Sequence, residues 1–265
     1  MEQTNEFDRQ AAEWDLWAAT YDDDIAGFLD VDGPVDFIAG AAGGRPVLEL
    51  GIGSGRIAVP LARRGIAVTG IDASGEMLKR LRQHADELPV DAHVADMADF
   101  QLPAQHSVVY VVASTFLLLT TATRQASCVA SAARALTPEG ILVIEASMPA
   151  TVIAGDRGIV VRHVAQDHLR LTVQTHDPAA QLVRSQEIRL QSDGRWRMLP
   201  SAKRYVSLAE LDIMAQLAGL RLHARYNDWD ESPLTAASRR HISVYARSAD
   251  AGRLGIPTFR TAISR

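Results

Sequence analysis

Three glycines at alternate positions, Gly51, Gly53 and Gly55, stand in the stretch "VLELGIGSGR" directly after an apolar run. Glycine has no β-carbon and accepts positive φ values, so this spacing lets the backbone approach a ligand closely. Nicotinamide dinucleotides, nucleoside triphosphates and S-adenosylmethionine are all bound beside glycine-rich turns. The chemistry of the chain therefore depends on which of these ligands the turn fits.

Two of the three ligands fit this turn poorly. The dinucleotide fingerprint G-x-G-x-x-G needs a third glycine at the position where this chain has Arg56. A phosphate loop needs Gly-Lys-Ser or Gly-Lys-Thr, and this chain has Gly-Arg-Ile. Glu49, two residues before the first glycine, is unfavourable beside a pyrophosphate. It suits the ammonium group of S-adenosylmethionine, which carries no phosphate.

Two further carboxylates stand where the same ligand would need them. Asp72 ends the second apolar run and can accept hydrogen bonds from both ribose hydroxyls, each worth roughly 1.5–3 kcal/mol. A dinucleotide site would use the same acid, so Asp72 alone does not discriminate. Asp96 and Met97 follow the third apolar run. A carboxylate there can accept from the adenine amino group, and a methionine can lie against the ring.

The elements that must position these residues form an alternating pattern. Apolar runs fit strands at residues 45–51, 66–72, 89–96, 107–114 and 141–147. Helical patterns fit residues 55–65, 74–88, which has Ser74 as its N-cap, and 120–140. Near-continuous apolar strands separated by helices predict an α/β fold, with a parallel sheet covered on both faces.

The second half of the chain begins with a different pattern. Between residues 157 and 206, apolar and polar residues alternate in three stretches that fit antiparallel strands, at 168–176, 182–191 and 195–206. A capping box from Ser207 to Glu210 then begins a helix that ends at Gly219. Two more strands are predicted at 220–229 and 241–247.

Residues 14–247 resemble the class I S-adenosylmethionine-dependent methyltransferases. The motifs that carry the resemblance are "ELGIGSG", "GIDAS", "VADMADF" and "ALTPEGILVIE". The resemblance implies a doubly wound, seven-stranded, mostly parallel sheet, with S-adenosylmethionine as cofactor and S-adenosylhomocysteine as product. It places Gly51, Gly53 and Gly55 at the methionine part of the cofactor, Asp72 at the ribose, and Asp96 and Met77 at the adenine. We also expect cofactor contacts from Glu49, Ala73, Met97 and Ala113.

The stretch "WAATYDDD" resembles the N-terminal segment of the small-molecule branch of this family, where a tyrosine followed by aspartate closes over the cofactor. Tyr21 is the candidate for that lid, whereas Trp14 and Trp17 are interpreted as one apolar helix face. The branch includes sugar amine, glycine and antibiotic-tailoring methyltransferases. Its insertion forms a roof over the substrate and in some members a dimer interface.

This resemblance divides the chain into zones. We predict an N-terminal helical lid (1–45), a cofactor-binding α/β core (46–156), an antiparallel β insertion (157–206), the last helix and strands of the core (207–247) and a tail (248–265). The first zone holds eleven acidic and two basic residues, and the insertion holds four acidic and nine basic ones. We therefore predict that the insertion packs near the N-terminal helices, in the same chain or a symmetry mate, and that their opposite charges help the lid to dock. The alternatives are that both charged faces are only solvated, or that the basic insertion attracts an anionic acceptor.

The expected reaction is methyl transfer to a nitrogen or oxygen atom of a small organic acceptor. The stretch "ASTFLLLTT" after the fourth strand has no His, Asp or Glu. It also has no Asn/Asp-Pro-Pro-Tyr motif, which weighs against a nucleic-acid or protein-amide acceptor. Tyr21, His163 and His168 are the candidates for a catalytic role. An RNA or protein methyltransferase and a noncatalytic regulatory protein of the same fold remain alternatives.

Composition limits the partners. The net charge of −5 weighs against nucleic acid as the main partner. A single cysteine, Cys128, excludes an intrachain disulfide framework and a cysteine zinc cluster. The run Asp22–Asp24 is interpreted as solvated or capping, so no metal is expected. With no apolar signal core and no apolar run of transmembrane length, we expect a cytoplasmic protein without a membrane partner, which can form a homodimer.

Overall fold

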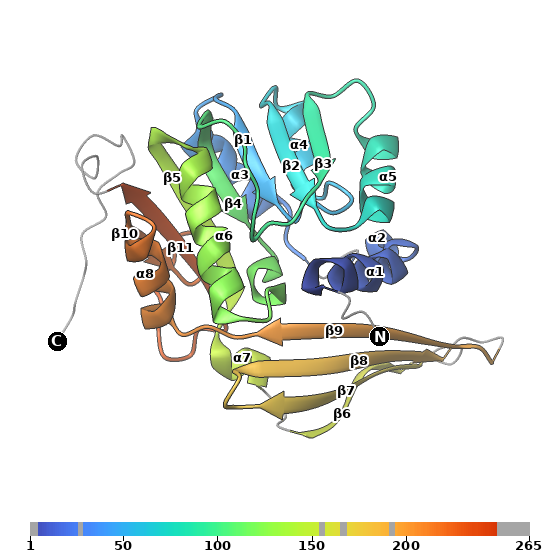
Figure 1. Cartoon of the computed structure of the whole chain (residues 1–265). Coiled ribbons are helices and arrows are strands. Elements are labelled where there is room, and N and C mark those ends of the chain that lie inside the picture. The colour runs from blue at the N-terminus through green and yellow to red at the C-terminus, as the bar shows by residue number, and fades with distance from the viewer. Residues whose placement is uncertain (1–4, 26–28, 154–156, 165–168, 191–193, 248–265) are drawn as a thin grey trace.

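The described part of the protein contains two β-sheets and the helices packed around the larger sheet (Figure 1). The structure is a computed structural model that describes residues 5–25, 29–153, 157–164, 169–190 and 194–247. The larger sheet, sheet A, has seven strands in the order β10-β11-β5-β4-β1-β2-β3. Strands β1 to β5 are parallel, and β11 is antiparallel to both of its neighbours. The predicted doubly wound, mostly parallel sheet is confirmed.

Five parallel strands and two C-terminal strands compose sheet A. They are β1 (Val47–Leu50), β2 (Val68–Asp72), β3 (Val90–Val94), β4 (His106–Val111), β5 (Leu136–Ser147), β10 (Leu220–Tyr226) and β11 (Arg240–Arg247). The strand order reverses between β1 and β4, which are neighbours in the sheet but not in the chain. In open α/β sheets, ligands bind outside the carboxyl ends of the strands at such a reversal.

Helices cover both faces of sheet A. Side chains along each strand alternate between the two faces, and the strands carry apolar residues on both, so both faces need a covering layer. One core contains Val47 and Val68 with helices α3 (Asp32–Ala42), α4 (Ala58–Arg63) and α5 (Gly75–His84). The other contains Leu48 and Leu50 with α6 (Ala122–Ala135) and α8 (Leu208–Leu217). The short 3-10 helix η1 (Thr115–Leu118) follows β4 directly and joins the second core.

The insertion forms a separate antiparallel sheet of four strands, sheet B, after the short helix α7 (Pro149–Ile153). Its strands are β6 (Arg157–Val164), β7 (Leu169–Asp177), β8 (Leu182–Leu190) and β9 (Trp196–Arg204). Strands β7 to β9 match the three predicted stretches, and β6 is an additional strand. Sheet B packs through β9 against η1 and the N-terminal helix.

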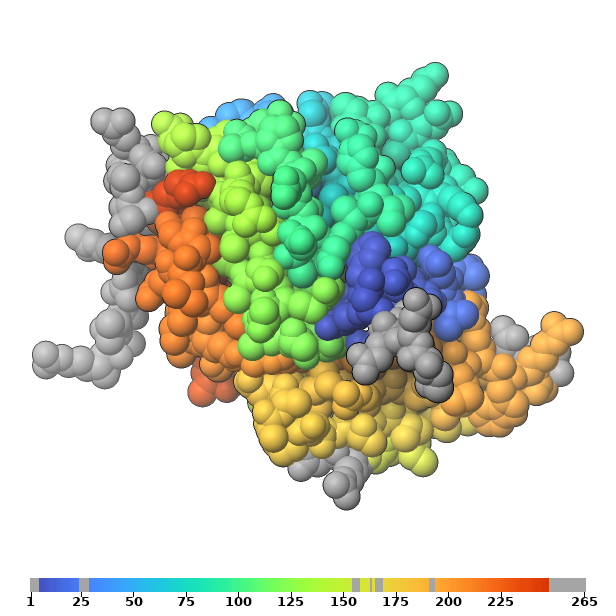
Figure 2. All heavy atoms as spheres, in the orientation of Figure 1, coloured from blue at the N-terminus to red at the C-terminus, as the bar shows by residue number. Residues whose placement is uncertain are grey.

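The N-terminal helices α1 (Glu6–Ala18) and α2 (Tyr21–Ile25) lie between α5 and sheet B (Figure 1). The space-filling view shows this segment, in dark blue, wedged between the core and the insertion strands (Figure 2). Trp17 Nε1 donates to the carbonyl of Pro200 at 3.1 Å, and Arg197 Nη1 donates to Thr20 Oγ1 at 3.4 Å. The predicted packing of the insertion against the N-terminal helices is therefore confirmed.

Helix α6 ends earlier than the sequence pattern indicates. It was expected to continue to residue 140, but it ends at Ala135, and Leu136 is already extended with ψ of 139°. Pro138 explains part of the difference, because a proline disfavours helical backbone at the residue before it, here Thr137. Gly140 lies within β5, where a β-carbon would stand 2.9 Å from the His106 carbonyl oxygen.

Candidate functional site

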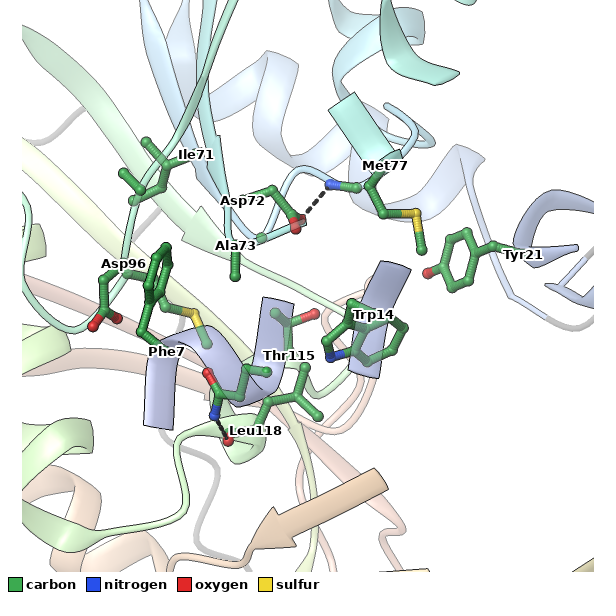
Figure 3. Close-up of a pocket in the computed structure, with 15 residues that line it drawn as sticks. Phe7, Trp14, Tyr21, Ile71, Asp72, Ala73, Met77, Asp96, Thr115 and Leu118 are labelled. Atoms are coloured by element: carbon green, nitrogen blue, oxygen red, sulfur yellow. Dashed lines mark hydrogen bonds between the residues drawn. The ribbon is translucent and has the colours of Figure 1, made fainter. Parts of the chain in front are cut away.

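A cavity opens at the carboxyl ends of β1 and β2, beside the reversal of strand order (Figure 3). The cavity is lined by Phe7, Gln10, Trp14, Tyr21, Gly51, Gly53, Ile71, Asp72, Ala73, Met77, Ala95, Asp96, Met97, Thr115 and Leu118. Eight of these are predicted cofactor residues: Tyr21, Gly51, Gly53, Asp72, Ala73, Met77, Asp96 and Met97. The structure therefore brings together most of the candidates, which lie in separate segments of the sequence.

The glycine turn forms one wall of the cavity. Gly51 and Gly53 have φ values of 74° and 55°, a region that side-chain-bearing residues rarely adopt. A β-carbon on Gly51 would collide with the side-chain methyl of Thr115, so the turn and η1 approach each other closely. The turn thus exposes backbone where a ligand can lie flat against it.

Asp72 stands at the end of β2 with its carboxylate held by backbone groups. Gly53 N donates to Oδ2 and Ser74 N to Oδ1, both at 2.8 Å. Burial raises the pKa of Asp72, and these two hydrogen bonds oppose the rise. Ser74 also caps α5, as predicted, by accepting from Met77 N at 3.0 Å. The oxygens of Asp72 can accept further hydrogen bonds from a ligand in the cavity, because each has capacity beyond one bond.

Asp96 lies at the opposite end of the cavity from Tyr21 (Figure 3). Its Oδ1 accepts from Ala98 N at 2.8 Å and from Arg124 Nη2 at 3.0 Å. Both partners engage the same oxygen, so Oδ2 can accept from a ligand. Met97, the next residue, also lines the cavity and supplies an apolar surface.

Helix α1 supplies a wall that the motifs did not predict. Phe7, Gln10 and Trp14 lie at helical spacing on one face of α1, and all three line the cavity. Gln10 Nε2 donates to the carbonyl of Leu118, which joins the helix to η1. Trp14, which was interpreted with Trp17 as one apolar helix face, contributes an apolar surface to the cavity. The face could have been recognised from the spacing of Phe7, Gln10 and Trp14 with Tyr21, since these residues recur every three to seven positions.

Tyr21 completes this wall at the start of α2. Its ring packs edge-on against Trp14, with the ring centroids 6.1 Å apart. Burial raises the pKa of the Tyr21 hydroxyl, which therefore stays protonated at neutral pH. The side chain faces Met77 across the cavity (Figure 3). This placement is compatible with the predicted lid.

Three acidic residues attach α1 and α2 to the core around the cavity. Glu6 accepts from Thr120 N at 2.9 Å and pairs with Arg124 at 3.3 Å. Asp15 accepts from Ser74 Oγ at 2.5 Å. Asp22 accepts from Ser54 Oγ in the glycine turn and from Arg80 of α5. In the described contacts these acids bind core groups, and the predicted docking by opposite charges between this segment and the insertion stays a prediction.

Two predicted cofactor residues next to the turn lie off the cavity wall. Glu49 is 2% exposed and accepts from the Tyr110 hydroxyl at 2.9 Å. Burial raises the pKa of Glu49 to about 8. A β-carbon on Gly55 would collide with Leu81 and Val59, so this glycine allows helices to pack closely.

The remaining candidates have separate locations. Ala113 lies in the turn after β4, where its backbone N–H donates to Glu145 Oε2 at 2.8 Å. His163 lies in β6, and His168 falls outside the described residues. Among the residues that line the described cavity, only Tyr21, Asp72 and Asp96 have titratable side chains. In the parts of the chain that the structure describes, three or more metal-ligating side chains do not cluster, and no helix is long and apolar enough to cross a bilayer.

Residues 47–140, which include the glycine turn, Asp72 and Asp96, match the sequence family described as a methyltransferase domain. A relative is the cypemycin N-terminal methyltransferase of a Streptomyces species. It is 29% identical over 206 residues, which are 77% of this chain and 84% of that protein.

Solved structures extend the similarity over nearly the whole chain. The CcbJ methyltransferase from Streptomyces caelestis is 34% identical, with a TM-score of 0.83 over 91% of this chain and 99% of that one. An amino pentose methyltransferase from Micromonospora echinaspora, solved with S-adenosylmethionine bound, has a TM-score of 0.66 at 21% identity. The match covers 89% of this chain and 95% of that chain, and it is a likeness of fold.

Proposed function

The chain belongs to the S-adenosylmethionine-dependent methyltransferases, and on that premise we propose that it methylates the nitrogen of a small organic amine, in specialised metabolism. S-adenosylmethionine supplies an activated methyl group. The tasks left to the protein are to bind both molecules, align the acceptor with the methyl group and exclude water.

The proposed cofactor orientation follows the polar groups of the cavity. Asp72 accepts from the ribose hydroxyls, and Asp96 accepts from the adenine amino group through Oδ2. Met77 and Met97 contact the adenine ring, and the Gly51 and Gly53 backbone lies beside the methionine part. Two carboxylates and no cationic side chain on the wall support a cofactor without phosphate. Tyr21 and Trp14 close the cavity on the side of α1.

The choice of nitrogen rests on the titratable groups of the cavity. Transfer to a hydroxyl usually needs a general base, whereas an amine needs only to arrive neutral. On the described cavity wall, Asp72 and Asp96 are engaged by backbone N–H groups, and the raised pKa of Tyr21 keeps its hydroxyl protonated. Some relatives have names that indicate methylation of a nitrogen, including the cypemycin N-terminal methyltransferase. An amine acceptor, which needs no general base, is therefore compatible with the side chains of the described cavity wall.

The test compares acceptors that differ in one atom. Purified protein is incubated with S-adenosylmethionine and paired small amines and alcohols of the same skeleton, and S-adenosylhomocysteine is quantified. We expect turnover with amines, at a rate that rises with pH as the acceptor itself deprotonates. Turnover confined to alcohols, RNA or protein amides would contradict the proposal.

A cofactor-site variant controls this assay. Asp72→Ala should weaken S-adenosylhomocysteine binding by about 2–4 kcal/mol, because charged hydrogen bonds to the ribose are lost. Calorimetry measures the loss, and circular dichroism checks that the variant is folded. Unchanged affinity would remove Asp72 from the binding site.

We also propose that the protein forms a homodimer through the outer face of sheet B. Strand register places Ile159, Val161, Trp196 and Met198 on one face of the sheet. Their exposed fractions are 67%, 58%, 61% and 59%. Exposed apolar patches of this kind mark interaction surfaces in soluble proteins. A second copy presents the same patch and would cover it.

A further inference from the structure

The turn between β4 and η1 contains two consecutive residues in left-handed backbone conformation. Ala113 and Ser114, which are not glycines, have φ values of 56° and 61°. This conformation costs a non-glycine residue about 1–2 kcal/mol. The surrounding structure must therefore hold the turn in place.

The end of β5 holds this turn through the Glu145 side chain and the Ser147 backbone N–H. Glu145 Oε2 accepts from Ala113 N at 2.8 Å. Ser114 Oγ accepts from Ser147 N at 2.9 Å. Glu145 is 8% exposed, and its hydrogen bond to the turn is partly buried. A buried backbone N–H that loses its acceptor is penalised by the full desolvation of the group.

Glu145 is itself fixed from the neighbouring strand. Arg240 of β11 donates to Glu145 Oε1 at 3.3 Å, and it also pairs with Asp228 in the segment after β10. Asp228 in turn accepts from Trp229 N at 2.7 Å. The two ion pairs Asp228–Arg240 and Arg240–Glu145 therefore connect the C-terminal strands to the turn. Asp228 does not line the cavity.

The turn determines where Thr115 lies. Thr115 follows Ser114 directly, and its methyl group fills the space that a β-carbon on Gly51 would occupy. Thr115 and Leu118 both line the cavity, on the side opposite Asp72 (Figure 3). A change of backbone conformation at residues 113–114 would move this side of the cavity away from the glycine turn.

We propose that Glu145 is a positioning residue for cofactor binding and methyl transfer: it holds residues 113–114 in their left-handed conformation and so keeps Thr115 against Gly51. The assignment rests on the proposed cofactor cavity. Glu145 does not line the cavity, so it acts through the turn.

Calorimetry with S-adenosylhomocysteine tests this role without a known acceptor. Glu145→Ala should weaken binding about tenfold, because the partly buried N–H of Ala113 loses its acceptor and the turn relaxes. Glu145→Gln keeps an oxygen for Ala113 N and should bind within about threefold of the wild type. Adding Ala113→Gly to Glu145→Ala should restore at least about half of the lost binding free energy, because glycine adopts positive φ without strain.

Asp212→Ala is the matched control for loss of a partly buried ion pair. Asp212 pairs with Arg225 at 2.5 Å, and neither residue lines the cavity. This variant should lower the thermal midpoint and leave the affinity unchanged. A merely structural Glu145 would behave like Asp212: Glu145→Ala would lower the midpoint at wild-type affinity, and the glycine would rescue nothing.

The two failures are distinguishable. If the wild type binds S-adenosylhomocysteine and Glu145→Ala binds it equally well, the positioning role is overturned and the proposed function stands. If the wild type does not bind, the cofactor cavity is wrong and the assignment of Glu145 falls with it.

Discussion

The carboxylates around the glycine turn differ in their access to the cavity and in their protonation state. Asp72 is held by two backbone N–H groups and faces the cavity, whereas Glu49 is buried beside the Tyr110 hydroxyl. Burial raises the pKa of Glu49 to about 8, and the negative charge of Asp72 acts in the same direction. At neutral pH Glu49 is therefore mostly protonated, and a neutral carboxyl group attracts an ammonium group only weakly.

Glu49→Gln tests this state, because glutamine mimics a protonated glutamate. The folded-state pKa lies above the unfolded value, so folding binds the proton more tightly. The Glu49 contribution to stability is then full below the unfolded pKa and is lost as pH rises toward about 8. The stability of Glu49→Gln relative to wild type should rise between about pH 5 and about pH 9 in thermal unfolding. A pH-independent difference would show that Glu49 is ionised throughout.

Cofactor affinity provides the second measurement on the same variant. If Glu49 stays protonated and off the cavity wall, Glu49→Gln should bind S-adenosylhomocysteine within about twofold of the wild type at neutral pH. A loss of about tenfold or more would restore the sequence prediction that Glu49 binds the cofactor ammonium.

At the scale of elements, helix α2 is attached to the glycine turn and to α5 by one side chain. Asp22 accepts from Ser54 Oγ and from Arg80 at 2.9 and 2.7 Å. Hydrogen bonds from Ser54 and Arg80 keep the pKa of Asp22 below its usual range despite its partial burial. Weakening this attachment should let the N-terminal segment open more often.

Asp22→Asn should therefore raise the dissociation rate of S-adenosylhomocysteine by about threefold to tenfold, since the ion pair is partly exposed and its worth is reduced by solvent. Stopped-flow displacement measures this rate. Asp36→Asn is the control, because Asp36 pairs with Arg64 at the surface and away from the cavity wall. Equal dissociation rates in both variants would mean that α2 does not gate the cofactor.

The sequence predicted elements best where a local pattern specifies them. Ser74 begins α5 as expected, and Ser207 caps α8 by accepting from Glu210 N at 3.1 Å. The reciprocal half of that capping box is absent from the described contacts, because the Glu210 side chain pairs with Arg204. That pairing is tertiary, so the local sequence does not encode it.

The same distinction holds in the site. Asp72 and Asp96 were predicted because each ends or follows an apolar strand, and parallel strands bring their carboxyl ends to one edge. The hydrogen bond from Ala113 N to Glu145 joins residues 32 positions apart, so no local sequence pattern predicts it. Phe7 and Gln10 carry a helical spacing, but their place in the cavity depends on how α1 docks.

On the scale of the whole molecule, the described contacts of the acidic N-terminal segment lead to the core, and docking by opposite charges stays a prediction. Glu6, Asp15 and Asp22 of the acidic segment bind the core. Arg197 of the insertion reaches the Thr20 hydroxyl and the Leu16 carbonyl of α1. The contact between the insertion and the N-terminal helices was predictable from the resemblance to the small-molecule branch, whose insertion forms a roof over the substrate. Which side chains interact depends on how far each of them reaches, and the sequence does not specify this.

The outer face of sheet B leads to the last prediction, which concerns assembly. The wild type should have twice the chain mass of 28.8 kDa in light scattering after size-exclusion chromatography. Ile159→Asp with Met198→Glu should give the monomer mass, because unpaired charges at the centre of an apolar interface are strongly unfavourable. Cofactor affinity should persist, since neither residue lines the cavity. The control is Leu217→Asp on α8, an equally apolar position that is 81% exposed and should remain dimeric. A monomeric wild type, or a double variant that stays dimeric, would show that sheet B is not the interface.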